Sequence, residues 1–181
     1  VPRIVIGMAT IYDMCYDQLT DAQRILIREN LIHKGLKPLY MDLTGPNRVF
    51  YHNKAMMRCT GLLIGTLAII NDDNKAELGK YLDRAYAYAK HFLDVRYTEA
   101  DNEGYSYTNV SLEDLIIGMD CSSRITGREG LLNHPYFSEV LVDWVVDYLY
   151  QLKLRSRIEL EYNRIKQENE QLIYNAMLAE E

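Results

Sequence analysis

Three apolar segments carry small residues in their middle, and this pattern constrains the fold more than any other feature of the chain. Gly7 and Ala9 lie in the first segment, Gly61 and Gly65 in the second, and Gly118 in the third. A glycine inside a helix costs about 1 kcal/mol relative to alanine, so its use there indicates a close approach between neighbouring backbones. Amphipathic segments alternate with these three. The pattern predicts either an inner ring of helices covered by an outer ring or a compact bundle that tolerates a few glycines.

Helix signals recur along the chain, whereas strand patterns are almost absent. Thr20 and Gln23 form a capping box that starts a helix, and Gly35 is a natural stop for it. Ser111 and Asp114 can cap a later helix in the same way, after a polar and irregular stretch over residues 96–108. The first segment is apolar almost all round, which is typical of a buried helix. The sequence therefore predicts an all-α fold with about seven helices, over residues 4–16, 20–35, 53–70, 75–95, 111–123, 133–152 and 155–181.

The end of the chain differs in composition from the rest, which predicts two parts, a helical domain over residues 1–152 and a charged helix over residues 153–181. The apolar positions of that helix fall on one side: Ile158, Tyr162, Ile165, Leu172 and Ala176. Asn169 interrupts this stripe. The pattern is typical of a partly exposed amphipathic helix or of a short coiled-coil-like segment that could support self-association.

Composition excludes several classes of protein. Of 181 residues, 20 are Lys or Arg and 26 are Asp or Glu, and the formal net charge of −6 disfavours broad binding to nucleic acid or to anionic membranes. No apolar run approaches the ~20 residues that a membrane-spanning helix needs. The three cysteines are widely spaced and show no metal-ligand pattern, so we expect buried thiols and neither a metal site nor a cofactor.

Two windows could carry chemistry. Residues 47–58 hold Arg48, Lys54 and Arg58 with His52 and no acid, and such a cationic helix start could receive a carboxylate or sulfate. Residues 97–123 hold six acids and no Lys, Arg or His until the helix ends. The chain also has 15 tyrosines against three phenylalanines, and hydroxyl-bearing aromatic faces suit sugar rings. The alternatives are a solvated helix start for the first window and ordinary packing for most tyrosines.

Four motifs, in order, resemble the helical toroid domain of the heparinase II/III-like and alginate-lyase-like polysaccharide lyases. Residues 12–24 (YDMCYDQLTDAQR) are similar to a helix and turn of that family, and residues 52–54 (HNK) with 61–68 (GLLIGTLA) resemble its Asn-bearing inner helix. Residues 103–107 (EGYSY) resemble the loop that ends on the catalytic Tyr, and residues 126–128 (TGR) before 134–135 (HP) also recur. The resemblance implies a partial (α/α) toroid of antiparallel helix hairpins, because a closed ring and the β-sheet domain that usually follows need far more residues.

The resemblance implies β-elimination at a uronate of an acidic polysaccharide. Asn53 would neutralise the sugar carboxylate, Tyr107 would act as the acid or base, and His52 is a further catalytic candidate. Many relatives have His directly after the Asn, whereas Lys54 stands there in this chain and His52 precedes it. The resemblance also implies a periplasmic or secreted location. Substrate contacts would come from Arg48, Lys54, Arg58, Glu103 and Tyr105.

Two other functions remain open from the sequence. The chain could be a non-catalytic helical module that binds carbohydrate or assembles through its charged tail. A glycoside hydrolase would need two carboxylates flanking a cleft, for which Asp101 and Glu103 are the candidates, although they stand close together in the sequence. The chain could also be one part of an enzyme whose C-terminal domain completes the site.

Overall fold

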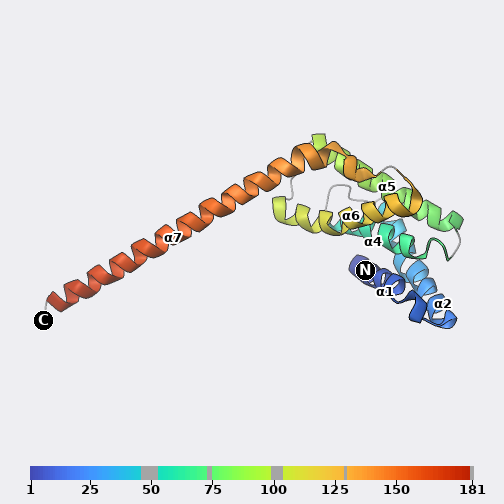
Figure 1. Cartoon of the computed structure of the whole chain (residues 1–181), viewed down its shortest axis with the longest axis horizontal. Helices are drawn as coiled ribbons and strands as arrows, with labels where there is room; N and C mark the ends of the chain where they lie inside the picture. Colours follow the sequence, from blue (N-terminus) through green and yellow to red (C-terminus); the bar gives the residue numbers. More distant parts are fainter. Residues whose placement is uncertain (46–52, 73–74, 99–103, 129, 180–181) are drawn as a thin grey trace. The chain divides into compact units, whose positions relative to one another are not determined.

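The structure is a computed structural model that describes residues 1–45, 53–72, 75–98, 104–128 and 130–179 (Figure 1). For residues 75, 104–106, 108–109 and 172–179 only the backbone is described. The described residues form helices and turns and no strand, which confirms the all-α class with about seven helices. The helices are α1 (Pro2–Met14), α2 (Asp21–Asn30), α3 (Lys37–Thr44), α4 (Asn53–Ile69), α5 (Lys75–Thr98), α6 (Gly104–Thr126) and α7 (Val142–Ala179). Shorter turns are η1 (Tyr16–Gln18), η2 (Leu31–Leu36), η3 (Leu131–Asn133) and η4 (Tyr136–Leu141).

The chain divides into two compact units, unit 1 (Val1–Ser138) and unit 2 (Glu139–Glu181). Unit 1 contains α1 to α6, and unit 2 contains α7. The two separate helices expected over residues 133–152 and 155–181 are wrong, because α7 continues through this region as one helix (Figure 1). No proline or glycine interrupts residues 142–179, so nothing local stops the helix.

The N-terminus of α2 is as the sequence predicts, but the expected stop at Gly35 is wrong. Thr20 Oγ1 accepts a hydrogen bond from the backbone N–H of Gln23, and Gln23 Oε1 accepts one from the backbone N–H of Thr20. At Gly35 the chain continues through the π-helical turn η2 into α3. A Cβ on Gly35 would lie 2.8 Å from Val5 Cγ2, so this glycine allows α1 to approach and does not end a helix.

The expected helix start at Ser111 is also wrong. Helix α6 begins at Gly104 and α5 extends to Thr98, so residues 96–98 and 104–108 of the predicted irregular stretch are helical. Ser111 lies inside α6, where its Oγ donates a hydrogen bond to the carbonyl oxygen of Tyr107 at 2.8 Å. A serine that bonds to the preceding helical turn in this way does not act as a cap.

Helix α4 is the centre of unit 1 and runs in the same direction as α1. A Cβ on Gly61 would lie 3.2 Å from Pro2 Cα, and one on Gly65 would lie 2.6 Å from Val5 Cγ1. Later positions of α1 therefore face later positions of α4, so the two helices are parallel. The absence of a Cβ atom at Gly61 and Gly65 allows this close packing, as the glycine pattern predicts.

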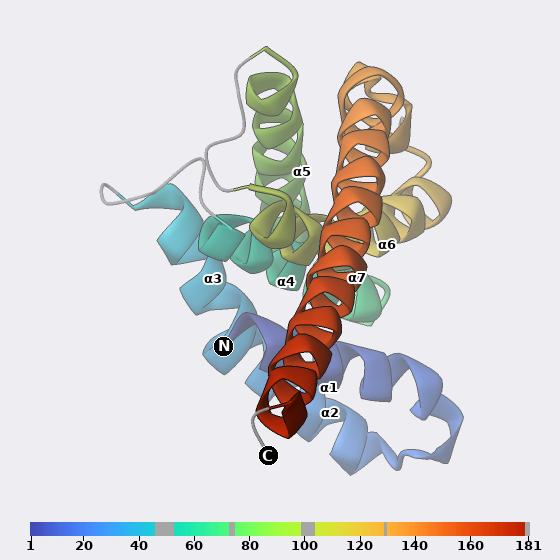
Figure 2. The same ribbon diagram turned by 90° about the vertical axis from the view of Figure 1, so that its left-hand side faces the viewer.

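Helix α6 packs on another side of α4, also in the same direction. A Cβ on Gly118 would lie 3.1 Å from Leu63 Cδ2, and one hollow is lined by both Ile70 and Ile125. Helices α1, α4 and α6 thus form one layer in which α4 lies between the other two (Figure 2).

A second layer covers α4 with helices that run the opposite way. Leu36 and Leu39 of the η2–α3 segment face Gly65 and Gly61 respectively, in reversed order. Helix α5 also returns antiparallel, because Cys59 Sγ of α4 donates to the carbonyl oxygen of Ala85 at 3.1 Å and Ile70, after α4, lines a hollow with Gly79 and Leu82. Unit 1 therefore consists of three helices in one direction, backed by helices of the opposite direction.

The expectation that α1 is buried all round is wrong. Val5, Ala9 and Tyr12 face the core, whereas Ile4 is 70% and Ile11 is 53% exposed. A Cβ on Gly7 would meet no atom within 4 Å, so this glycine does not mark a close approach. Only one face of α1 is covered by the described residues.

Candidate functional site

The parallel packing of α4 and α6 brings two predicted site residues to the same end of unit 1. Asn53 is the first residue of α4, and Tyr107 lies in the first turn of α6. Because Leu63 faces Gly118 and the two helices run in the same direction, their N-terminal turns lie at a common end. Pro2, at the start of α1, faces Gly61 in the middle of α4 and so does not belong to this end. Helix N-termini carry partial positive charge, so this end of the layer favours anions.

Asn53 and Tyr107 differ strongly in exposure. Asn53 is 7% exposed, and its Oδ1 accepts a hydrogen bond from the backbone N–H of Lys54 at 2.7 Å. The Lys54 side chain is exposed. Tyr107 is 56% exposed. Among the described residues, the Tyr107 ring is therefore open to solvent, whereas Asn53 is largely covered.

Arg58 lies one and a half turns into α4, beside a hollow on the side of that helix that faces α1 and α3. Its Nε is 3.1 Å from Asp42 Oδ2 of α3, so the charge of this predicted substrate-binding residue is compensated. Both side chains are more than a third exposed, and exposed pairs of this kind contribute only about 0–1 kcal/mol. An incoming carboxylate can compete for the guanidinium. The hollow has a volume of about 150 Å³ and is lined by Val1, Pro2, Pro38, Leu39, Asp42 and Arg58.

The other predicted site residues lie outside the described part of the chain. Arg48, His52 and Glu103 belong to segments that the structure does not describe, as does Asp101 of the glycoside hydrolase alternative. The backbone of Tyr105 is described as part of α6, but its side chain is not. Their roles stay predictions.

The structure also pairs a histidine with a carboxylate that sequence reasoning missed. His134 Nε2 lies 3.1 Å from Asp94 Oδ1, and the backbone N–H of Tyr136 points to His134 Nδ1 at 3.2 Å. The tautomer that satisfies both contacts carries its proton on Nε2. Since Nδ1 is then an occupied acceptor and the side chain is only 12% exposed, this imidazole is not placed to act as a base. The pair holds the segment after α6 against α5.

Replacement of Asp94 should lower stability in a pH-dependent way. Hydrogen bonds from Lys90, and then from His134, hold the pKa of Asp94 below its ordinary value. A lowered pKa means that the ionised form stabilises the fold above the ordinary pKa of about 4, and that this contribution is lost as the pH falls through the lowered pKa. Because Asp94 is 44% exposed, Asp94→Asn should cost no more than about 1 kcal/mol at pH 7. Urea denaturation should show the two proteins converging on acidification, and a difference that is constant with pH would contradict the assignment.

A second cluster lies at the opposite end of unit 1, where the sequence resembles the family's first motif. Tyr12 donates a hydrogen bond to Asp72 Oδ2 at 2.8 Å, and Tyr16 donates one to Asp72 Oδ1 at 3.3 Å. The guanidinium of Arg24 lies 4.1 Å from the centre of the Tyr16 ring and donates to the Tyr16 carbonyl oxygen. These contacts tie the end of α1 to α2 and to the end of α4. The motif therefore has a structural role here.

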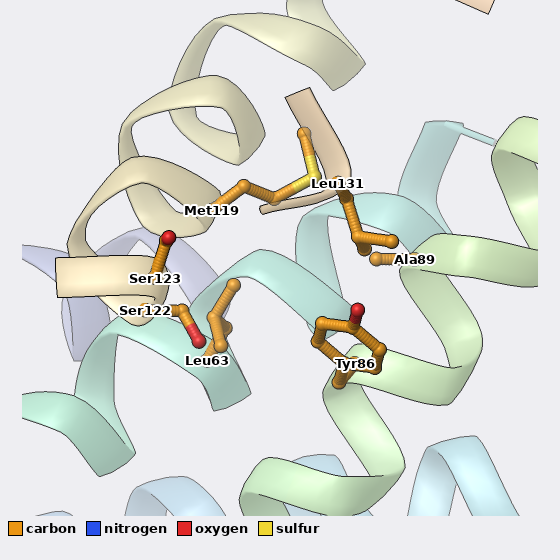
Figure 3. A pocket seen from close by; sticks show the side chains of 7 residues that line it. All are labelled: Leu63, Tyr86, Ala89, Met119, Ser122, Ser123 and Leu131. Carbon is orange, nitrogen blue, oxygen red and sulfur yellow. The ribbon is translucent and has the colours of Figure 1, made fainter. Parts of the chain in front are cut away.

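A small cavity between α4, α5, α6 and η3 is too small for a substrate. It has a volume of about 10 Å³, and Figure 3 shows its lining side chains, among them Leu63, Tyr86, Met119 and Ser122. A space of this size holds one water molecule at most. Nearby in the core, burial raises the pKa of Cys59 to about 12, which keeps its thiol protonated and unreactive. This confirms the expected buried thiol at that position.

Comparisons with protein-family models, with curated proteins and with solved structures found no match for this chain. Within the described residues, no three side chains of His, Cys, Asp or Glu are grouped so that they could hold a metal ion. Among the described helices, none is both long enough and apolar enough to span a membrane.

Proposed function

We propose that unit 1 is part of an (α/α) toroid that binds an acidic polysaccharide and cleaves it by β-elimination at a uronate. The observation that carries this proposal is the placement of Asn53 and Tyr107 in the first turns of two adjacent helices of the same direction. The sequence resembles family motifs in which an Asn and a Tyr take part in this reaction. The layer of same-direction helices, backed by antiparallel helices, is also the repeat from which such a toroid is built.

The chemistry divides between the two residues. In this reaction the amide N–H groups of Asn53 would donate to the uronate carboxylate, while its Oδ1 accepts from the backbone N–H of Lys54. Withdrawal of charge from that carboxylate acidifies the adjacent C5–H, and the carbanion-like state is stabilised by the same donors. The predicted base, His52 or Tyr107, removes the C5 proton, the C4–O bond breaks, and a C4–C5 double bond forms. Tyr107 protonates the leaving glycosidic oxygen.

Positive charge around the site would hold the polymer. Lys54 is exposed, and the N-termini of α4 and α6 add partial positive charge at the same end. Arg58 lies further along α4, beside the 150 Å³ hollow and paired with Asp42. Lys54 and the two helix N-termini would offset part of the net charge of −6, which would otherwise repel a polyanion. Binding should therefore weaken as ionic strength rises.

The test is ultraviolet absorbance of the unsaturated uronate product, with alginate, heparan sulfate, hyaluronan and chondroitin as substrates. Tyr107→Phe keeps the ring and removes the hydroxyl, and we expect a loss of about 100-fold or more in rate with little change in binding. Tyr150→Phe is the matched control, since Tyr150 is 69% exposed on α7, and its rate should equal that of the parent protein. Asn53→Ala should lower the rate of product formation by about 100-fold.

The outcomes separate the candidate functions. Equal rates for Tyr107→Phe and the parent protein would remove the lyase proposal at its central residue. Retained binding of a polymer by the folded protein with no product from any of the four would favour the non-catalytic carbohydrate-binding module.

A further inference from the structure

Helix α7 exposes large apolar side chains along most of its described length. Every described side chain from Val146 to Gln171 is exposed. Ile158 is 61%, Tyr162 is 66% and Ile165 is 46% exposed. Isolated helices gain little stability from propensity alone, and the helices of folded proteins depend on packing of an apolar face. An exposed apolar surface of this kind is typical of an interaction site.

The apolar residues of α7 follow a heptad pattern from residue 158 onward. Ile158 and Ile165 occupy d positions, Tyr162 and Asn169 occupy a positions, and the sequence continues the series with a d position at residue 172 and an a position at residue 176. Alternating spacings of four and three residues define the seam of a left-handed coiled coil. The two preceding core positions, 151 and 155, are Gln and Arg, so the seam begins at Ile158.

We propose that α7 pairs with α7 of a second copy of this chain, in register and parallel, as a two-stranded coiled coil over residues 158–179. Asn169 then faces its counterpart across the seam. A polar Asn at one a position specifies a two-stranded, in-register arrangement, because the amides bond to each other only when they stand at the same level. The residue that interrupts the apolar stripe thereby selects the partner.

The charges beside the seam favour the same arrangement. Glu161 occupies a g position and Lys166 occupies the following e position, which face each other between two parallel chains. In an antiparallel pair the g positions of the two chains would meet, which would bring together Glu161 and Glu168 of both copies. Within one chain Glu161 contacts Arg164, and Lys166 lies 3.9 Å from Glu170. These side chains are all more than half exposed, so such weak contacts can give way to interchain pairs.

The first test is the molar mass of the full chain in solution, measured by light scattering across a concentration series. We expect twice the 21.1 kDa of one chain. Ile165→Asp places a charge in the seam and should raise the dissociation constant of the dimer by about 100-fold or more. Leu160→Asp is the matched control, because Leu160 is 71% exposed at an f position on the outer side, and it should leave the mass unchanged.

Orientation is tested by reversing charges. Glu161→Lys would face Lys166 of the second copy and should weaken the dimer, whereas Glu161→Lys combined with Lys166→Glu should restore it. Circular dichroism of each variant checks that the helices of unit 1 remain folded. A monomeric parent protein, a dimer that survives Ile165→Asp, or a double variant no tighter than Glu161→Lys would each overturn the proposal.

Discussion

Gly65→Ala should lower the free energy of unfolding by about 1–3 kcal/mol, although alanine is the better helix former. The added Cβ would lie 2.6 Å from Val5 Cγ1 and 2.7 Å from Leu36 Cδ2. Val5 is 3% and Leu36 is 0% exposed, so neither side chain can move out into solvent. The helices α1 and α4 must separate, or both neighbours must leave their preferred rotamers.

Gly79→Ala is the matched control for this prediction. Gly79 lies inside α5, and a Cβ there would meet no atom within 4 Å. The same substitution should therefore raise the free energy of unfolding by up to about 1 kcal/mol through helix propensity. Urea denaturation of the two variants and the parent protein measures both effects. Equal or higher stability of Gly65→Ala would show that α1 and α4 do not approach as described.

Asp72→Ala should lower the free energy of unfolding by about 1–3 kcal/mol, because it leaves a buried tyrosine hydroxyl without its acceptor. Tyr12 is 0% exposed, and its hydroxyl lies 2.8 Å from Asp72 Oδ2. Tyr16 loses its hydrogen bond to the same carboxylate. Asp72→Asn retains an acceptor oxygen and should cost less.

A double-mutant cycle isolates the buried contact. In a Tyr12→Phe background the hydroxyl that loses its acceptor no longer exists, so Asp72→Ala should cost less than in the parent protein, with a coupling energy of about 0.5–3 kcal/mol. Burial, and then the Asp72 carboxylate, raise the pKa of Tyr12 to about 12, so Asp72→Ala should also lower that pKa. Ultraviolet titration of tyrosinate measures this shift. Additive costs in the cycle would contradict the contact.

The glycines show how far local sequence reasoning extends. Their presence inside apolar segments predicts close packing, and Gly61, Gly65 and Gly118 do lie where neighbouring helices approach α4. The same reasoning is wrong for Gly7, which meets no neighbour, and for Gly35, which packs against Val5 and does not end a helix. A glycine has the same local propensity in all of these places, so only its tertiary neighbours distinguish them.

The candidate site depends even more on tertiary structure. Asn53 and Tyr107 are far apart in the sequence, and the resemblance to a family is what relates them before the fold is known. Their common end follows from the parallel packing of α4 and α6, which side-chain contacts along both helices determine. The pairing of Asp94 with His134 has no local signal, because the two residues come from separate segments.

The sequence by itself determined the features that depend on neighbours along the chain. These are the all-α class, the capping box at Thr20, the bounds of α4 and the heptad spacing of α7, since hydrogen bonds within a turn and the helical period are local. Tertiary structure alone decided the directions of the helices, the burial of only one face of α1, the partner of Asp72 and the compensation of Arg58 by Asp42. Those features arise from contacts between distant segments, and their free energy depends on which surfaces meet when the chain folds.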